Sequence, residues 1–279
     1  MANNGTKDSD YIVALDIGTS KVVCIIGKYI DQHSIEVISM GSYPSSGLKK
    51  GVVVNIDATT DAIQKSIDQA QASFEGKIKN VFVGIAGNHI RSLNSHGIVG
   101  IKDKEVTPGD IDRVIEAAQA VAIPSDQRVL HVLPQEYVID DQDSIRDPLG
   151  MSGVRLESHV HLVTCANNAI QNIEKCVKRC GIGVDGFVLE QLASSYSVLS
   201  EDEKELGVCL VDIGGGTTDI AIFKSGSISF TGVIPIAGDQ VTSDIAALVR
   251  TPTAQAEDIK QKHGCAAAEL TQDGETLEV

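Results

Sequence analysis

Hydrophobic and polar positions along the chain follow two periods, and their alternation predicts an α/β protein. Short apolar runs such as YIVAL, VVCIIG and VFVGIA are typical of strands, whereas longer stretches with apolar residues three or four apart are typical of helices. The chain opens with a predicted hairpin, in which YIVAL enters a turn at 16–21 and VVCIIG leaves it. A helix is predicted from about Asp57 to just before Gly76, and one of its faces carries Ile63, Ile67, Ala70 and Phe74.

A middle segment, 86–163, differs in composition from the sequence on either side, because it contains several prolines and the acidic loop DDQDSIRD. A helix is predicted to begin at TPGD, with Thr107 as its N-cap and Pro108 at its first position, and to end before Pro124. The stretches RVLHVLPQEYVI and HVHLVT alternate like strands. We interpret 86–163 as a subdomain inserted into a first lobe.

Helical patterns return after this segment. Asn167 is the predicted N-cap of a helix closed by Gly181, and another helix is predicted around 190–199. The polar stretch SEDEKELG is interpreted as a charged link. The sequence PIAGDQVTSDIA is predicted to begin a further helix, in which Gly238 allows close approach and Asp239 is the cap.

The composition excludes several classes of protein. A formal net charge of −15 argues against a nucleic-acid-binding surface. The polar N-terminus MANNGTKDSD lacks the apolar core of a signal peptide, and no apolar run approaches the ~20 residues of a membrane-spanning helix. The cysteines form no CxxC pair, which favours buried, reduced thiols in a cytoplasmic protein; four of them lie in apolar or small-residue contexts, namely Cys24, Cys165, Cys209 and Cys265.

The sequence contains an internal repeat. IVALDIGTSKVVCIIG and VCLVDIGGGTTDIAIF each consist of an apolar strand, the triplet Asp-Ile-Gly, small or hydroxyl residues and a second apolar strand. The triplets occupy 16–18 and 212–214, so they are separated by 212 − 16 = 196 residues. The first copy alone is equally well explained as a plain turn. Two copies imply two similar halves, each presenting a glycine-rich turn.

Glycine-rich turns of this kind suit phosphate, because successive backbone N–H groups can point into one concavity. Hydroxyl groups nearby add donors: Thr19, Ser20, Thr217 and Thr218. Asp16 and Asp212 would repel phosphate directly but can hold Mg²⁺ through its waters, and Lys21 supplies one positive charge. The spacing matches neither GxxxxGK[ST] nor GxGxxG. Two facing turns therefore predict a clamp for a Mg-nucleotide between two lobes.

This pair of motifs resembles the two phosphate motifs of the actin-like ATPase superfamily. Within it the chain is similar to the FtsA family of bacterial cell-division proteins, and this resemblance spans nearly everything after the first ten residues. It rests on PSSGLKKGVVVNIDATTDAI, RVLHVLPQEYVID, GMSGVRLESHVHLVTC and LASSYSVLSEDEKELGVCLVDIGGGTTDIAIF. The resemblance implies an actin-like (ribonuclease-H-like) duplicated two-lobe ATPase fold with an inserted FtsA-type α+β subdomain. The implied divisions are a disordered tail at 1–10, a first lobe at 11–85 and 164–205, the insertion at 86–163 and an incomplete second lobe at 206–279.

The resemblance also implies which residues bind the nucleotide. The first phosphate turn would be lined by Asp16, Gly18, Thr19, Ser20 and Lys21. The second would be lined by Asp212, Gly214, Gly215, Gly216 and Thr217. Asp16 and Asp212 would hold Mg²⁺ through water. Glu190 and Gln191 fall where the superfamily often positions the attacking water, although a charge favoured by the helix dipole explains Glu190 equally well.

Glu257 and Lys260 lie three apart on one predicted helical face, from which both are implied to reach the ribose and adenine of ATP. The alternative is a solvated surface ion pair worth about 0.3 kcal/mol. The superfamily's third glycine motif is absent after Lys260, and the sequence stops at Val279. We therefore expect a fragment or a truncated reading frame, without the C-terminal amphipathic helix that tethers FtsA to the membrane.

The function implied by the family is that of an ATP-binding, polymerising adaptor. It would link the ring of the tubulin-like protein FtsZ to the cytoplasmic face of the inner membrane at mid-cell. Other division proteins would be recruited through the insertion, and any ATP hydrolysis would be slow. The alternatives are a small-molecule kinase, for which no separate base is found, a chaperone-type ATPase, which would need a peptide-binding domain, and a pilus-assembly scaffold.

Overall fold

Two antiparallel three-stranded meanders of the same design form the frame of the fold. The computed structural model describes residues 11–31, 34–270 and 276, so the predicted tail 1–10 lies outside the described residues. The first meander comprises β1 (Tyr11–Ile17), β2 (Lys21–Tyr29) and β3 (Ile35–Pro44). The second comprises β12 (Val208–Ile213), β13 (Thr218–Lys224) and β14 (Ser227–Ile234). The internal repeat seen in the sequence is therefore a repeat of a structural unit.

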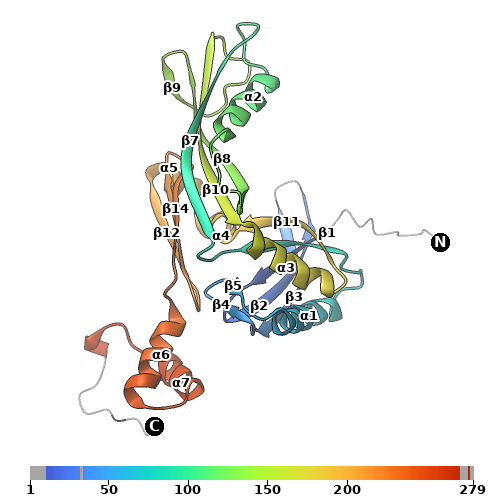
Figure 1. The fold of residues 1–279 in the computed structure, drawn as a ribbon, viewed down its shortest axis with the longest axis vertical. Helices are drawn as coiled ribbons and strands as arrows, with labels where there is room; N and C mark the ends of the chain where they lie inside the picture. The colour runs from blue at the N-terminus through green and yellow to red at the C-terminus, as the bar shows by residue number, and fades with distance from the viewer. Residues whose placement is uncertain (1–10, 32–33, 271–275, 277–279) are drawn as a thin grey trace, which may run out of the picture.

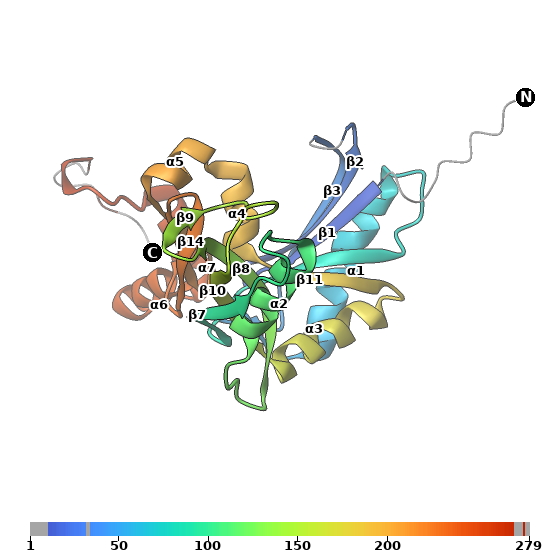
Figure 2. The ribbon, with the colours of Figure 1, turned by 90° about the horizontal axis from the view of Figure 1, so that it is seen from above.

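The first meander extends into a five-stranded sheet. Its order is β11-β6-β1-β2-β3, in which β6 (Asn80–Ile85) is parallel to both β1 and β11 (Gly183–Leu189). Two neighbouring helices, α1 (Ile56–Ala72) and α3 (Asn167–Arg179), pack in the same lobe (Figures 1 and 2). The main core lies between these elements, and its fully buried side chains include Leu15, Ile26, Ile63, Val81 and Ile170.

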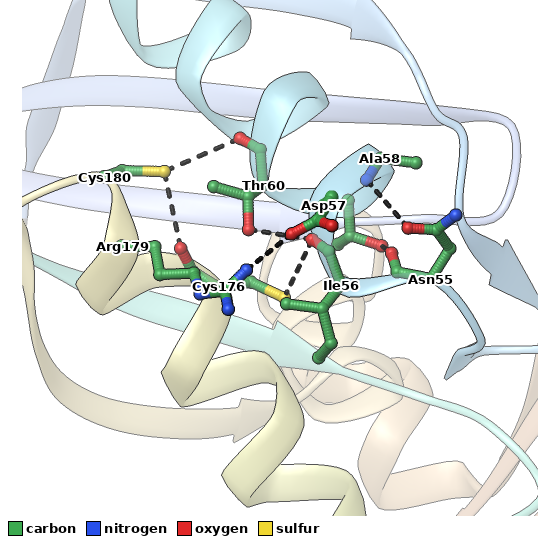
Figure 3. A network of polar contacts seen from close by, with 9 residues as sticks. Asn55, Ile56, Asp57, Ala58, Thr60, Cys176, Arg179 and Cys180 are labelled. Carbon is green, nitrogen blue, oxygen red and sulfur yellow. Dashed lines mark hydrogen bonds and ion pairs between the residues drawn. The ribbon is translucent and has the colours of Figure 1, made fainter.

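Polar contacts fix the start of α1 to the end of α3 (Figure 3). The Asn55 side chain caps α1 by accepting from the Ala58 N–H at 3.0 Å. Arg179 forms an ion pair with Asp57 at 2.6 Å, and the Cys176 thiol donates to the Ile56 carbonyl at 3.7 Å. Because β11 follows α3 directly, this contact helps to place the chain that leads to residue 190.

The expectation of uniformly buried cysteines is wrong for two of the four residues. Cys24 and Cys165 are buried, and burial raises the pKa of each thiol to about 12. Cys209 and Cys265 are exposed free thiols. Cys209 lies on β12, where alternate side chains point away from the core, so an apolar sequence context did not imply burial.

The residues between β6 and α3 form a separate four-stranded sheet. Its order is β7-β10-β8-β9, with β7 (Ile90–Gly100), β8 (Gln127–Ile139), β9 (Gln142–Ile145) and β10 (Arg155–Ala166). The helix α2 (Pro108–Gln119) packs on β7 and β10. As predicted, Thr107 is its N-cap and Pro108 its first residue; Thr107 and Asp110 form a reciprocal capping box.

Strand β14 of the second meander lies against the lower part of this sheet (Figure 1). Side chains of the sheet bind its backbone: Ser92 Oγ donates to the Thr231 carbonyl at 3.0 Å, and Gln135 Nε2 donates to the Ile228 carbonyl at 2.9 Å. The buried ring of His161 lies 3.0 Å from Thr231 Oγ1, and burial lowers the pKa of this histidine to about 4. The inserted sheet is therefore hydrogen-bonded to the second lobe.

Among the described residues, the remaining elements are two short strands, four α-helices and a 3-10 turn. Strands β4 (Leu48–Lys49) and β5 (Val52–Val53) form a small hairpin. The helices are α4 (Glu190–Val198), α5 (Glu201–Leu206), α6 (Gly238–Val249) and α7 (Thr253–His263), followed by the 3-10 turn η2 (Ala268–Leu270). In the described ranges, none of the helices has the length and apolar character needed to cross a bilayer.

Three local predictions were wrong. Asn167 is not an N-cap but the first residue of α3, because β10 continues to Ala166 and the Asn167 amide instead donates to the Ser125 carbonyl at 3.3 Å. The stretch SEDEKELG is not a link, since Ser200 and Glu203 cap the helix α5. Asp239 lies inside the first turn of α6 rather than at its cap.

Candidate functional site

The two glycine-rich turns close in the same way. In the first, the Gly18 N–H donates to the Lys21 carbonyl at 3.0 Å, and in the second the Gly214 N–H donates to the Thr217 carbonyl at 2.9 Å. Each bond joins residues three apart, and the pairs are again 196 positions apart in sequence (214 − 18 = 217 − 21 = 196). The predicted duplication thus extends to the hydrogen bonding of the turns.

The turns of the two lobes face each other at contact distance. A Cβ atom added to Gly215 would lie 2.1 Å from Ser20 Oγ, and one added to Gly216 would lie 2.8 Å from Thr19 Oγ1. Helix α6 supports the second turn from behind, because the Asp239 N–H donates to the Gly215 carbonyl at 2.8 Å. In the described part of the chain, the N–H groups of Gly215 and Gly216 donate to no acceptor. Both glycines line a cavity between the lobes.

Four carboxylates meet at the base of this cleft. Asp212 and Asp219 are directly opposite each other across β12 and β13, a placement that like charges disfavour. Helix α4 holds both: Gln191 Nε2 donates to Asp219 at 3.0 Å, and Ser194 Oγ donates to Asp212 at 3.2 Å. Asp16 and Glu190 complete the group, since each interacts electrostatically with Asp212.

Burial, together with the proximity of the other carboxylates, disfavours the charged forms of these side chains. Burial raises the pKa of Glu190 well above its usual range, and the charges of Asp16, Asp219 and Asp212 raise it further. Burial of its carboxyl, with a smaller contribution from Asp212, raises the pKa of Asp16 in spite of Lys21, although the residue as a whole is exposed. The pKa of Asp219 is raised to about 6, mainly by burial. Protonation of these carboxyls therefore offsets part of the negative charge that the ligand-free site would otherwise carry.

The donor set fits Mg²⁺ bound through water. No cluster of three or more His, Cys, Asp or Glu in the described ranges has the geometry of a direct metal site. Asp16 and Asp212 offer carboxylates, and the buried Oε1 of Gln191 has no partner among the described residues, so it could accept from a water. These residues would hold the ion, which would neutralise phosphate charge.

Asp219 was not among the predicted site residues, although it directly follows Thr217 and Thr218 of the second turn. We expect Asp219→Asn to stabilise the ligand-free protein at pH 8 by on the order of 1–2 kcal/mol, because the variant removes a buried charge that cleft solvent only partly screens. The wild-type carboxyl is protonated on folding below about pH 6, so the advantage of the variant should shrink from pH 8 toward pH 4. Urea unfolding at several pH values measures the difference in the free energy of unfolding between the variant and the wild type.

Asp103→Asn, in an exposed loop of the insertion, is the matched control and should change stability little at any pH. A destabilised Asp219→Asn protein at pH 8, or a difference that does not vary with pH, would contradict the assignment of a raised pKa to this carboxyl.

Glu257 and Lys260 are brought to the second turn but bind each other. Their ion pair measures 2.7 Å, and Lys260 Nζ also donates to the Gly238 carbonyl at 3.2 Å and to Thr242 Oγ1 at 2.9 Å. The bond from Lys260, with others from Thr242 and Gln261, lowers the pKa of Glu257 to about 2. The pair therefore lies beside Gly238, the first residue of α6.

One contact from the insertion was not foreseen. His131 on β8 accepts a hydrogen bond from the Leu189 N–H at 2.9 Å. Leu189 immediately precedes Glu190, so this histidine fixes the start of α4. Burial lowers the pKa of His131, which favours the neutral ring that this bond requires. No sequence pattern signals this contact, because it joins strands 58 residues apart.

Comparison with known families gives matches to two parts of the chain. Residues 87–164 match the family model described as "SHS2 domain inserted in FTSA". Residues 209–279 match the one described as "Cell division protein FtsA". The first range nearly coincides with the inserted sheet, and the second contains the second glycine-rich turn.

Curated proteins that are similar along nearly the whole chain are also named cell division protein FtsA. The proteins named cell division protein FtsA from Pseudomonas aeruginosa, Neisseria meningitidis and Escherichia coli K12 are 67%, 51% and 46% identical over 268, 269 and 272 residues. These alignments include 96%, 96% and 98% of the chain. The chain spans 64–65% of the length of these curated relatives.

Solved structures confirm the predicted actin-like fold. A chain of a PilM-PilN type IV pilus biogenesis complex superposes with a TM-score of 0.69 at 15% identity, over 91% of this chain and 70% of that one. MreB5 of Spiroplasma citri bound to ADP superposes with a TM-score of 0.50 at 16% identity, over 91% of this chain and 63% of that one. At these identities the likeness concerns the fold alone.

Proposed function

Because the chain belongs to the FtsA family of cell-division proteins, we propose that it binds Mg-ATP between its two lobes and acts as a polymerising adaptor in division. The observation that carries the proposal is the pair of identically closed glycine turns in contact across the cleft. Free N–H groups at Gly215 and Gly216 suit phosphate oxygens, and the carboxylates beneath them suit a hydrated cation.

Each predicted site residue has a role in this proposal. The turns 18–21 and 214–217 would bind the phosphates, and Asp16 and Asp212 would bind the waters of Mg²⁺. The ion pair of Glu257 and Lys260 would meet the nucleoside, because it adjoins the start of α6. Nucleotide binding across the lobes would fix their relative orientation and hence the shape of a protomer.

Hydrolysis, where it occurs, would depend on α4. Glu190 and Gln191 begin this helix at the base of the cleft, and Gln191 is itself hydrogen-bonded to Asp219. We propose that they orient the attacking water, with Asp219 and His131 as positioning residues. Burial, and then the charge of the surrounding carboxylates, raises the pKa of Glu190. A protonated carboxyl cannot accept a proton from the attacking water, which is consistent with a slow reaction.

The cellular role is part of the same proposal. We infer that the protein links FtsZ to the cytoplasmic face of the inner membrane at mid-cell, associates with further copies of itself and recruits other division proteins through the inserted sheet. Identities of 46–67% to proteins named cell division protein FtsA favour this role over a small-molecule kinase or a pilus-assembly scaffold.

The natural full-length protein provides the test. We expect it to bind ATP with Mg²⁺, to form sedimentable polymer with ATP, and to bring FtsZ from the same cell onto anionic lipid vesicles. Calorimetry measures the binding, and pelleting with and without vesicles measures the other two properties. Rapid ADP formation that requires a small-molecule acceptor, in the absence of polymer, would instead support the kinase alternative.

A further inference from the structure

The small hairpin β4–β5 lies between the two phosphate turns and contacts both. On one side, the Gly51 N–H approaches Thr19 Oγ1 at 3.4 Å. On the other, a Cβ added to Gly216 would lie 3.1 Å from both the nitrogen and the Cα of Lys50. The hairpin belongs to the first lobe in sequence, yet its tip is packed against the turn of the second lobe.

Lys50 occupies an unusual backbone conformation at this tip. Leu48 pairs with Val53 and Lys49 with Val52, which leaves Lys50 and Gly51 as a two-residue loop. Both have positive φ, +52° for Lys50 and +74° for Gly51, as in a type I′ turn. Glycine, asparagine and aspartate suit the first loop position, whereas a lysine there is strained. The strain suggests a use for the lysine side chain.

The cavity beside the hairpin suggests what that use is. It has a volume of about 330 Å³ and is lined from both lobes, with Thr19, Lys49 and Lys50 on one side and Gly215, Gly216 and Asp239 on the other. Of the other lysines predicted at the site, Lys260 is paired with Glu257, and Lys21 belongs to the first glycine turn. Within the ranges that the structure describes, neither Lys49 nor Lys50 forms an ion pair.

We propose that Lys50 binds the outermost phosphate of a nucleoside triphosphate, so that the β4–β5 hairpin forms a third wall of the phosphate site and makes it selective for triphosphate over diphosphate. The inference rests on the proposed nucleotide binding. The two glycine turns would take the inner phosphates, and the hairpin tip adjoins both turns at the cavity. A compact ammonium on a flexible stem suits a terminal phosphate that is absent after hydrolysis.

Lys50→Asn separates this role from a structural one. Asparagine suits a positive φ better than lysine, so the variant should be at least as stable as the wild type, while it loses the charge. In the natural full-length protein with Mg²⁺, we expect its Kd for ATP to rise at least 20-fold and its Kd for ADP to change less than threefold. Lys50→Arg should retain most of the ATP affinity.

Lys102→Asn, in an exposed loop of the insertion, makes the same change in net charge and should leave both affinities unaltered. Unchanged ATP affinity in Lys50→Asn, or equal loss for ATP and ADP, would overturn the assignment while leaving nucleotide binding intact. A wild-type protein that binds neither nucleotide would overturn the proposed function and this inference together. Calorimetric titration with each nucleotide, with thermal unfolding of every variant, distinguishes these results.

Discussion

Replacing Gly215 with valine is expected to weaken ATP binding at least about 100-fold, which is about 2.7 kcal/mol. The Cβ of the variant would lie 2.1 Å from Ser20 Oγ and 3.2 Å from Asp239 Oδ1, and its two methyl groups would occupy the cleft. The backbone conformation at Gly215 does not require glycine, so the effect would arise from the space that the side chain takes. Calorimetric titration with ATP and Mg²⁺ measures it.

Gly100→Val is the matched control. Gly100 lies on β7 of the insertion, its φ is not positive, and a Cβ added there meets nothing within 4 Å. We expect ATP affinity within about twofold of the wild type for this variant. If Gly215→Val binds ATP as well as the control does, the second turn does not hold phosphate.

Glu190→Gln is expected to lower ATP hydrolysis about 100-fold while ATP affinity stays within about threefold. Glutamine has the same shape and can still hydrogen-bond water, but it cannot take a proton. Burial, and then the charges of three aspartates, raises the pKa of the wild-type carboxyl, so replacing it with a neutral amide should not destabilise the fold. Phosphate release at saturating ATP and Mg²⁺ measures the reaction.

The same variant tests the alternative reading of Glu190 as a charge placed to suit the dipole of α4. That reading predicts unchanged hydrolysis and a loss of about 0.3–1 kcal/mol in the free energy of unfolding. Glu201→Gln, at the exposed first residue of α5, serves as the control for hydrolysis and should leave the rate unaltered. Hydrolysis at the wild-type rate in Glu190→Gln would remove this residue from the mechanism.

Much of the fold follows from local patterns in the sequence. The 196-residue repeat predicted two similar halves, and the structure shows matching meanders with the same turn closure. The helix after Thr107 was predicted from its cap and its proline, both of which act within one turn. The capping box of Ser200 and Glu203 is an equally local signal, so α5 was predictable in principle.

Other features depend on contacts distant in sequence. Asn167 resembles a cap, but the preceding strand and the Ser125 carbonyl determine where α3 begins. The bond from Leu189 to His131 requires β8 and β11 to meet, and no local pattern encodes that. The glycines and Asp16 identify the site in sequence, whereas the strain at Lys50 depends on its φ, which is known only from the structure.

The inserted sheet is covalently continuous with the first lobe and hydrogen-bonded to the second through β14. A force on the outer end of the inserted sheet would therefore be transmitted to the cleft through two sets of contacts. One runs along β8 through His131 to the start of α4, and the other crosses from β14 to β13, whose second residue is Asp219. Tension applied by a partner at the far end of the insertion would therefore act on both α4 and β13, which lie at the base of the cleft.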